Sequence, residues 1–149
     1  MSNSYFQFKQ FRIDQGDCAM KVTTEGCILG AWAHALNPQG ILDIGAGTGV
    51  LSLMLAQRYN CTIDAVEIDQ LAANQALENF KSCPWNERLK IHHQDVAAFT
   101  SDSKIKYDLI ISNPPFFNSN LKSESRTKNL AIHDHSLPQE LLLQAISNM

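Results

Sequence analysis

The residues best equipped for chemistry follow the apolar run Leu109-Ile110-Ile111, in the segment Ser112-Asn113-Pro114-Pro115-Phe116. Two prolines fix φ and remove backbone donors, and the residue before a proline is driven toward extended geometry. The segment therefore presents an amide side chain, a free carbonyl and an aromatic ring at the end of a strand. An exocyclic amino group on a flat ring needs such a set, because its N–H groups require acceptors and its ring a stacking surface. An ordinary proline-rich turn is the simpler alternative.

A glycine-rich turn, Gly45-Ala46-Gly47-Thr48-Gly49, follows the apolar segment Ile41-Leu42-Asp43-Ile44. The apolar periodicity from Val50 onward predicts a helix after it. Glycines permit positive φ and close approach of a ligand, and a helix start supplies free N–H groups. The dinucleotide-binding pattern requires a small third residue at position 50, where valine stands. This spacing therefore disfavours a nicotinamide-dependent oxidoreductase.

Two acidic residues follow the next predicted strands. Glu67 ends the β-rich run 61–67, at the distance from the glycine-rich turn where a ribose-binding carboxylate belongs in such folds. Asp95 follows the run 89–93, where its side chain can accept from an adenine amino group or cap a helix. A solvated acid at a strand end is the alternative for Glu67.

The elements that must position these groups are four strands, expected near 41–44, 61–67, 89–93 and 107–112. Their alternation with helical segments predicts an α/β fold whose parallel strands end at one edge. We expect one domain over residues 1–149, with a lead-in over about 1–37 and a core over about 38–149.

These features resemble the class I methyltransferases that use S-adenosylmethionine (SAM), and more closely the bacterial family that methylates adenine N6 beside the anticodon of a valine tRNA. The resemblance implies a Rossmann-like, three-layer α/β/α fold. Further segments carry the closer match: Phe8-Lys9-Gln10-Phe11, Asp17-Cys18-Ala19-Met20-Lys21-Val22-Thr23-Thr24-Glu25-Gly26, Leu29-Gly30-Ala31-Trp32, Glu78-Asn79-Phe80 and Ser82-Cys83-Pro84-Trp85-Asn86-Glu87-Arg88.

The resemblance also implies roles for single residues. The oxygen of Asn113 and the carbonyl of Pro114 would accept the two N6 hydrogens of a flipped adenine, on which Phe116 would stack. The cofactor would lie against the lead-in, the glycine-rich turn and the two strand-end acids, here Met20, Lys21, Val22, Thr23, Asp43, Gly45, Gly47, Gly49, Glu67 and Asp95. Two other interpretations stay open: a protein-glutamine N5 methyltransferase, whose similar motif ends in tyrosine, and a fragment that binds SAM or RNA without turnover.

The end of the chain departs from that family. A full sheet has seven strands, so the expected four leave it incomplete, with the last strands missing and a helix expected over 137–149. The strand near 107–112 would then form an apolar edge, and such edges template pairing with another chain. We expect either poor solubility or a homodimer through residues 108–112.

Composition adds limits to these expectations. With 44% hydrophobic residues and no apolar run of membrane length, the chain is expected to be cytoplasmic with reduced cysteines. Histidine spacing does not favour a metal site. The net charge of −3 is unusual for a protein that binds tRNA, so Lys122, Arg126 and Lys128 are the candidates for phosphate contacts. A solvated loop without a partner is equally compatible with that segment.

Overall fold

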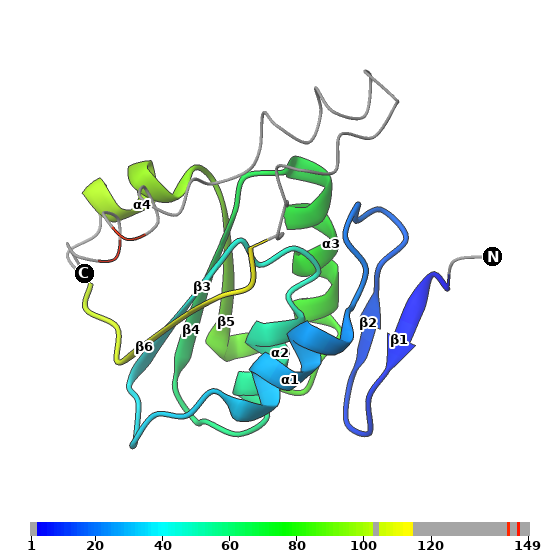
Figure 1. The fold of residues 1–149 in the computed structure, drawn as a ribbon, viewed down its shortest axis with the longest axis horizontal. Coiled ribbons are helices and arrows are strands. Elements are labelled where there is room, and N and C mark those ends of the chain that lie inside the picture. The colour runs from blue at the N-terminus through cyan, green and yellow to red at the C-terminus, as the bar shows by residue number, and fades with distance from the viewer. Residues whose placement is uncertain (1–2, 103–104, 115–142, 144–145, 147–149) are drawn as a thin grey trace.

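The computed structural model describes residues 3–102, 105–114, 143 and 146 (Figure 1). Within them, a parallel sheet has the strand order β5-β4-β3-β6. Its strands are β3 (Gly40–Ile44), β4 (Thr62–Glu67), β5 (Leu89–His93) and β6 (Leu109–Ser112). All four predicted strands are thus confirmed, and β6 is an edge strand among those described.

Helices cover both faces of this sheet (Figure 1). One face packs against α1 (Thr24–Trp32), α2 (Val50–Ala56) and α3 (Gln70–Lys81), and the other against α4 (Val96–Asp102). A short 3-10 helix, Asn86–Arg88, leads into β5. The predicted three-layer α/β/α architecture is therefore confirmed.

Strand β3 is the centre of the core. All five of its residues are buried, as expected for a parallel strand covered on both faces. Ile41 belongs to the cluster under α2 and α3, whereas Leu42 and Ile44 pack toward α4. The register pairs Ile44 with Val66 of β4 and with Ser112 of β6, so the carboxyl ends of these strands meet at one edge.

A separate antiparallel hairpin precedes the sheet and was not predicted. It consists of β1 (Tyr5–Gln7) and β2 (Arg12–Asp14). Strand β2 falls in the lead-in and pairs with β1, so it does not join the parallel sheet. The division into lead-in and core stays a prediction.

Several expectations concern segments outside the described residues. These are Pro115, Phe116, the cationic loop and most of the predicted terminal helix, of which Leu143 and Ile146 are described and helical. Ile146 packs against the cluster on the α4 face. None of the helices in the described part of the chain combines the length and the apolar character that a membrane span requires.

Candidate functional site

The glycine-rich turn connects β3 to α2 at the carboxyl edge of the sheet. Gly45, Gly47 and Gly49 have φ values of 70°, 55° and 79°, which side chains rarely tolerate. A Cβ at Gly45 or Gly47 would meet no atom within 4 Å, whereas a Cβ at Gly49 would lie 2.5 Å from Cε1 of Phe80. The first two glycines therefore border open space, and the third is packed against α3.

Glu67 lies beside this turn at the end of β4 and is only 9% exposed. Its Oε2 accepts a hydrogen bond from the backbone N–H of Gly47 at 2.8 Å, and its Oε1 accepts one from Asp69 at 2.9 Å. Each carboxylate oxygen has a second lone pair, so the group can still accept from a ligand. The backbone of the turn and the acid thus hold each other in place.

Asp43 lies beneath the turn and is fully buried. Its Oδ2 accepts from the backbone N–H and the hydroxyl of Ser52, at 3.1 and 2.6 Å. Its Oδ1 has no hydrogen-bond partner in the described part of the chain. Burial, with a smaller contribution from the charge of Glu67, raises the pKa of Asp43 to about 6, although the hydrogen bonds from Ser52 act in the opposite direction. A buried oxygen without a partner is costly and suits a cationic or donating ligand group.

Asp95 follows β5 and is exposed. Its Oδ1 accepts from the backbone N–H groups of Ala97 at 2.8 Å and Ala98 at 3.3 Å, so it caps α4. The neighbouring N–H of Gln94 donates to the carbonyl of Glu67 at 3.1 Å, which places this turn next to the strand-end acid. The cap that the sequence left open for Asp95 is present, and its contact with adenine stays a prediction.

The lead-in residues 20–23 are arranged mainly by contacts within the lead-in. The ammonium of Lys21 donates to the backbone carbonyls of Gln15 and Cys18. These hydrogen bonds hold the turn of residues 15–18 in place. The side chain of Gln15 accepts from the N–H of Val22 at 2.8 Å. Met20 is 43% exposed. The predicted contacts of these residues with a cofactor remain untested.

Asn113 follows the last residue of β6 and is half-buried. A Cβ added to Gly26 would lie 3.3 Å from its Nδ2, so the first turn of α1 packs against this amide. Thr23 caps that turn by accepting from the N–H of Gly26 at 3.1 Å. The structure therefore brings the start of α1 to Asn113. Pro114 is also half-buried, and the two predicted catalytic residues after it lie outside the described residues.

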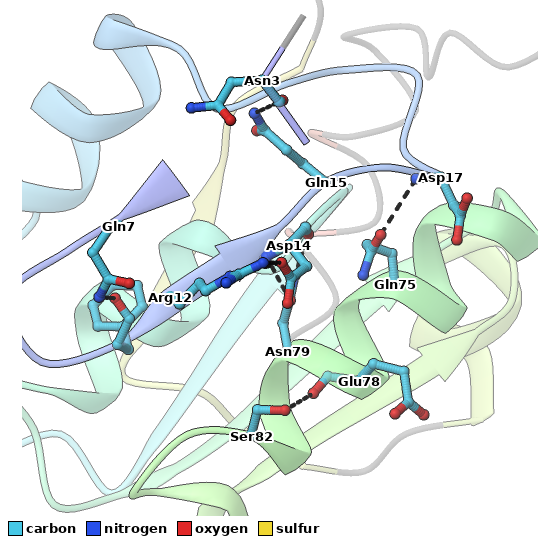
Figure 2. A network of polar contacts seen from close by, with 11 residues as sticks. Asn3, Gln7, Arg12, Asp14, Gln15, Asp17, Gln75, Glu78, Asn79 and Ser82 are labelled. Carbon is cyan, nitrogen blue, oxygen red and sulfur yellow. Dashed lines mark hydrogen bonds and ion pairs between the residues drawn. The ribbon is translucent and has the colours of Figure 1, made fainter. Parts of the chain in front are cut away.

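Asn79 was missed as a functional candidate. It is 2% exposed, its Oδ1 accepts from the N–H of Asp14 at 2.9 Å, and its Nδ2 donates to the carbonyls of Asp14 and Thr48 at 2.8 and 2.9 Å. Figure 2 shows this amide beside Asp14 and, farther along α3, Gln75 beside Asp17. One side chain thus connects β2 to the glycine-rich turn. In the sequence, Asn79 stood out only within the segment Glu78-Asn79-Phe80 that resembles the family. Hydrophobic periodicity does not reveal which groups a buried asparagine binds.

A metal site was not expected, and the described residues contain no group of three or more His, Cys, Asp or Glu side chains placed to hold an ion. His92 instead contacts Asp64, with 2.6 Å between Nε2 and Oδ1. His133 and His135 lie outside the described residues.

Comparison with known proteins gives both relatives and a fold. A protein of Cytophaga hutchinsonii named "tRNA1(Val) (adenine(37)-N6)-methyltransferase" is 48% identical over 150 residues, which cover 100% of this chain and 63% of that protein. A protein of Dyadobacter fermentans with the same name is 51% identical over 148 residues, covering 99% of this chain and 61% of its own. The chain thus spans less than two thirds of these relatives, and the expected resemblance is confirmed.

Solved structures share the fold at low sequence identity. An O-methyltransferase from Bacillus cereus in complex with SAH has a TM-score of 0.53 at 20% identity, covering 64% of this chain and 46% of its own. A SAM-dependent methyltransferase from Thiobacillus denitrificans with S-adenosyl-L-homocysteine has a TM-score of 0.50 at 20% identity, covering 78% and 45%. The expected class I methyltransferase fold is confirmed.

A family model described as "Methyltransferase small domain" matches residues 28–135, which include the glycine-rich turn, both strand-end acids and Asn113. That match extends over more than half of the sequence. The chain therefore belongs to the methyltransferase small domain family.

Proposed function

We propose that the chain is a SAM-dependent methyltransferase acting on the N6 amino group of adenine 37 in tRNA1(Val). The observation that carries the proposal is the common edge of the sheet, where Gly47, Glu67 and Asn113 come together at the ends of adjacent strands. The names of the relatives support the RNA substrate.

The residues present fit the cofactor. The open space above Gly45 and Gly47 leaves room for a ligand against the backbone, and the unpartnered Oδ1 of Asp43 would accept from a cationic amino group. Glu67 would hold the ribose hydroxyls and Asp95 the adenine amino group. When bound, SAM supplies a methyl group on a sulfonium whose leaving group is a neutral thioether.

Asn113 and Pro114 act on the acceptor. Their oxygens would accept the two N6 hydrogens of the target adenine, which aims the nitrogen lone pair at the methyl carbon. Because the leaving group is neutral, no strong base and no covalent intermediate are required, and catalysis rests on position and electrostatics. The adenine must leave its stack, which costs least in an RNA loop, and Phe116 remains its predicted stacking partner.

Asn113→Ala tests this assignment. With labelled SAM and an unmodified tRNA1(Val) transcript, methyl transfer should fall by about 100-fold or more, because one acceptor for the reacting amino group is lost. The affinity for S-adenosylhomocysteine should stay within about twofold. Asn86→Ala changes an exposed asparagine and serves as the control. An equal loss of cofactor affinity and turnover would remove the role given to Asn113.

The same assay separates the alternatives. Label in a protein fraction and not in RNA would favour protein-glutamine methylation. Cofactor binding without any transfer would favour a protein that binds SAM or RNA without turnover. A transcript with guanine in place of the target adenine should accept no label.

Two further expectations, on cellular location and on oligomeric state, belong to this proposal. Because its substrate is tRNA, we place the activity in the cytoplasm, which agrees with the four cysteines being free thiols. We also retain a homodimer through residues 108–112, supported by the edge position of β6 among the strands that the structure describes. Sedimentation showing a stable monomer at high concentration would count against the dimer.

A further inference from the structure

The N-terminal hairpin presents a surface that the proposed catalytic site does not use. We call residues Tyr5–Asp14 the aromatic hairpin. All three residues of β1 are exposed, including Tyr5 at 39% and Phe6 at 42%. A two-stranded hairpin is marginal by itself, and exposed aromatic side chains that gather in one place commonly mark a binding surface.

The exposed rings belong to a row that is anchored in the core. Phe6 contacts Phe8 with 4.9 Å between ring centroids, and Phe8 stacks on Phe11 at 4.5 Å. Phe11 is 5% exposed and meets Trp85 edge-on at 5.9 Å. The outer ring is therefore held in place before any partner arrives, which lowers the entropy cost of binding.

The turn of the hairpin is also ordered. The N–H of Phe8 donates to the carbonyl of Phe11 at 2.9 Å, and the amide of Gln7 donates to the same carbonyl at 3.1 Å. This places the exposed Lys9 at the tip, beside a groove of about 330 Å³. Aromatic, cationic and polar side chains line the groove, among them Phe8, Lys9, Phe11, Met54, Gln57 and Arg58.

Charge favours a polyanion at this surface. The chain carries a net charge of −3, whereas the hairpin contains two cations, Lys9 and Arg12, and one acid, Asp14. Arg12 forms an ion pair with Asp14, and its Cζ atom lies 4.0 Å from the ring centroid of Tyr5. The residues that line the groove include two cationic side chains, Lys9 and Arg58, and no carboxylate. The guanidinium of Arg58 donates to the carbonyls of Gly30, Ala31 and Ala33, so Lys9 is the cation at the rim that is available to a phosphate.

The groove is distinct from the cofactor site. Helix α2 begins at the glycine-rich turn, and Arg58 lies just after its last residue, Ala56. The groove also contacts Met54 within α2, so it runs along the second half of this helix, at least about 6 Å from the helix start.

We propose that the aromatic hairpin and its groove bind an unpaired nucleotide of the RNA substrate, outside the methylated adenine. Bases stack on aromatic side chains with little sequence preference, and cations at the rim neutralise the neighbouring phosphates. A groove of this size matches a single nucleotide. The inference rests on the proposed function, since it adds a second contact for the same RNA.

The test compares two double variants of the 149-residue chain. The first, Phe6→Ala with Lys9→Ala, removes the outer ring and the tip cation. The matched control, Leu77→Ala with Lys90→Ala, removes an exposed apolar side chain and a cation from α3 and β5. Fluorescence anisotropy at two salt concentrations gives the Kd for the tRNA1(Val) transcript and for oligouridine. Calorimetry gives the Kd for S-adenosylhomocysteine. Circular dichroism shows whether each variant is folded.

The hairpin variant should bind both RNAs about tenfold or more weakly, with a shallower salt dependence and unchanged cofactor affinity. The control should stay within twofold of the parent chain. Equal RNA affinity of the two folded variants would overturn the inference and leave the proposed function standing. Hairpin-dependent binding of oligouridine without methylation of tRNA would sink the proposed function alone, and a parent chain that binds neither RNA would contradict both.

Discussion

The carboxyl edge of the parallel sheet and the N-terminal hairpin are held in place by different means. At the sheet edge, β3 is buried along its whole length, and Glu67 is fixed by backbone N–H groups from both sides. The hairpin exposes β1, buries Phe11 and Ile13 in the core, and is hydrogen-bonded to α3 by the side chain of Asn79. A site that orients a cofactor requires the first arrangement, whereas a surface that receives a flexible partner tolerates the second.

The largest difference is expected between two glycines. Gly49→Ala forces a side chain into a left-handed conformation and against Phe80, 2.5 Å from the new Cβ, and should lower the free energy of unfolding by roughly 3 kcal/mol. Gly16→Ala in the lead-in meets no atom within 4 Å and should change it by less than about 0.5 kcal/mol. Urea denaturation of both variants measures the contrast, and equal effects would show that the two regions are equally tolerant.

A pH-dependent difference is expected for the buried acid. Because the pKa of Asp43 is raised to about 6 from 3.8, the folded protein holds a proton in this range that the unfolded chain has released. The stabilising contribution is therefore present below pH 3.8 and is lost as the pH rises through 6. The free energy of unfolding of the parent chain, relative to Asp43→Asn, should fall by up to about 3 kcal/mol between pH 4 and pH 7. A constant difference over that range would contradict the burial argument.

Loss of the Asn79 hydrogen bonds, which connect the hairpin to the glycine-rich turn, is expected to lower the free energy of unfolding by a somewhat smaller amount. Asn79→Leu removes three hydrogen bonds and leaves backbone groups of Asp14 and Thr48 without this partner, which should cost about 2–3 kcal/mol. Gln75→Ala removes one exposed bond of 3.3 Å and should cost less than about 1 kcal/mol.

Amide exchange distinguishes this local effect from general destabilisation. In Asn79→Leu, the N–H of Asp14 should exchange faster relative to the amides of β3, because the hairpin opens without the sheet. Uniform acceleration over both regions would mean that Asn79 stabilises the whole domain and does not specifically connect the hairpin to the glycine-rich turn.

The sequence predicted the sheet well because its signals are local. Buried parallel strands are continuous apolar runs, such as Leu109-Ile110-Ile111, and the glycines of the turn have no other common use at that spacing. The hairpin was not predicted because its strands, Tyr5–Gln7 and Arg12–Asp14, have three residues each. Neither strand shows a clear alternation of apolar and polar residues.

The orientation of side chains was harder to predict. Asp43 lies beneath the turn and its Oδ2 accepts from Ser52, a contact that spacing did not predict, while its contact with a cofactor stays a prediction. Lys21 donates to nearby carbonyls, a contact that depends on the path of the chain after β2. Such side-chain hydrogen bonds depend on how the chain is folded between the two residues. Secondary-structure propensity and hydrophobic periodicity therefore do not predict them.

The most direct test of the account is calorimetric titration of the 149-residue chain with S-adenosylhomocysteine, with NAD as the control ligand. We predict binding of S-adenosylhomocysteine alone, in the micromolar range, and a loss of about tenfold or more in Glu67→Ala, because a charged acceptor for the ribose is removed. Binding of neither ligand, or equal affinity of the parent and Glu67→Ala, would contradict the claim that this edge of the sheet is a cofactor site.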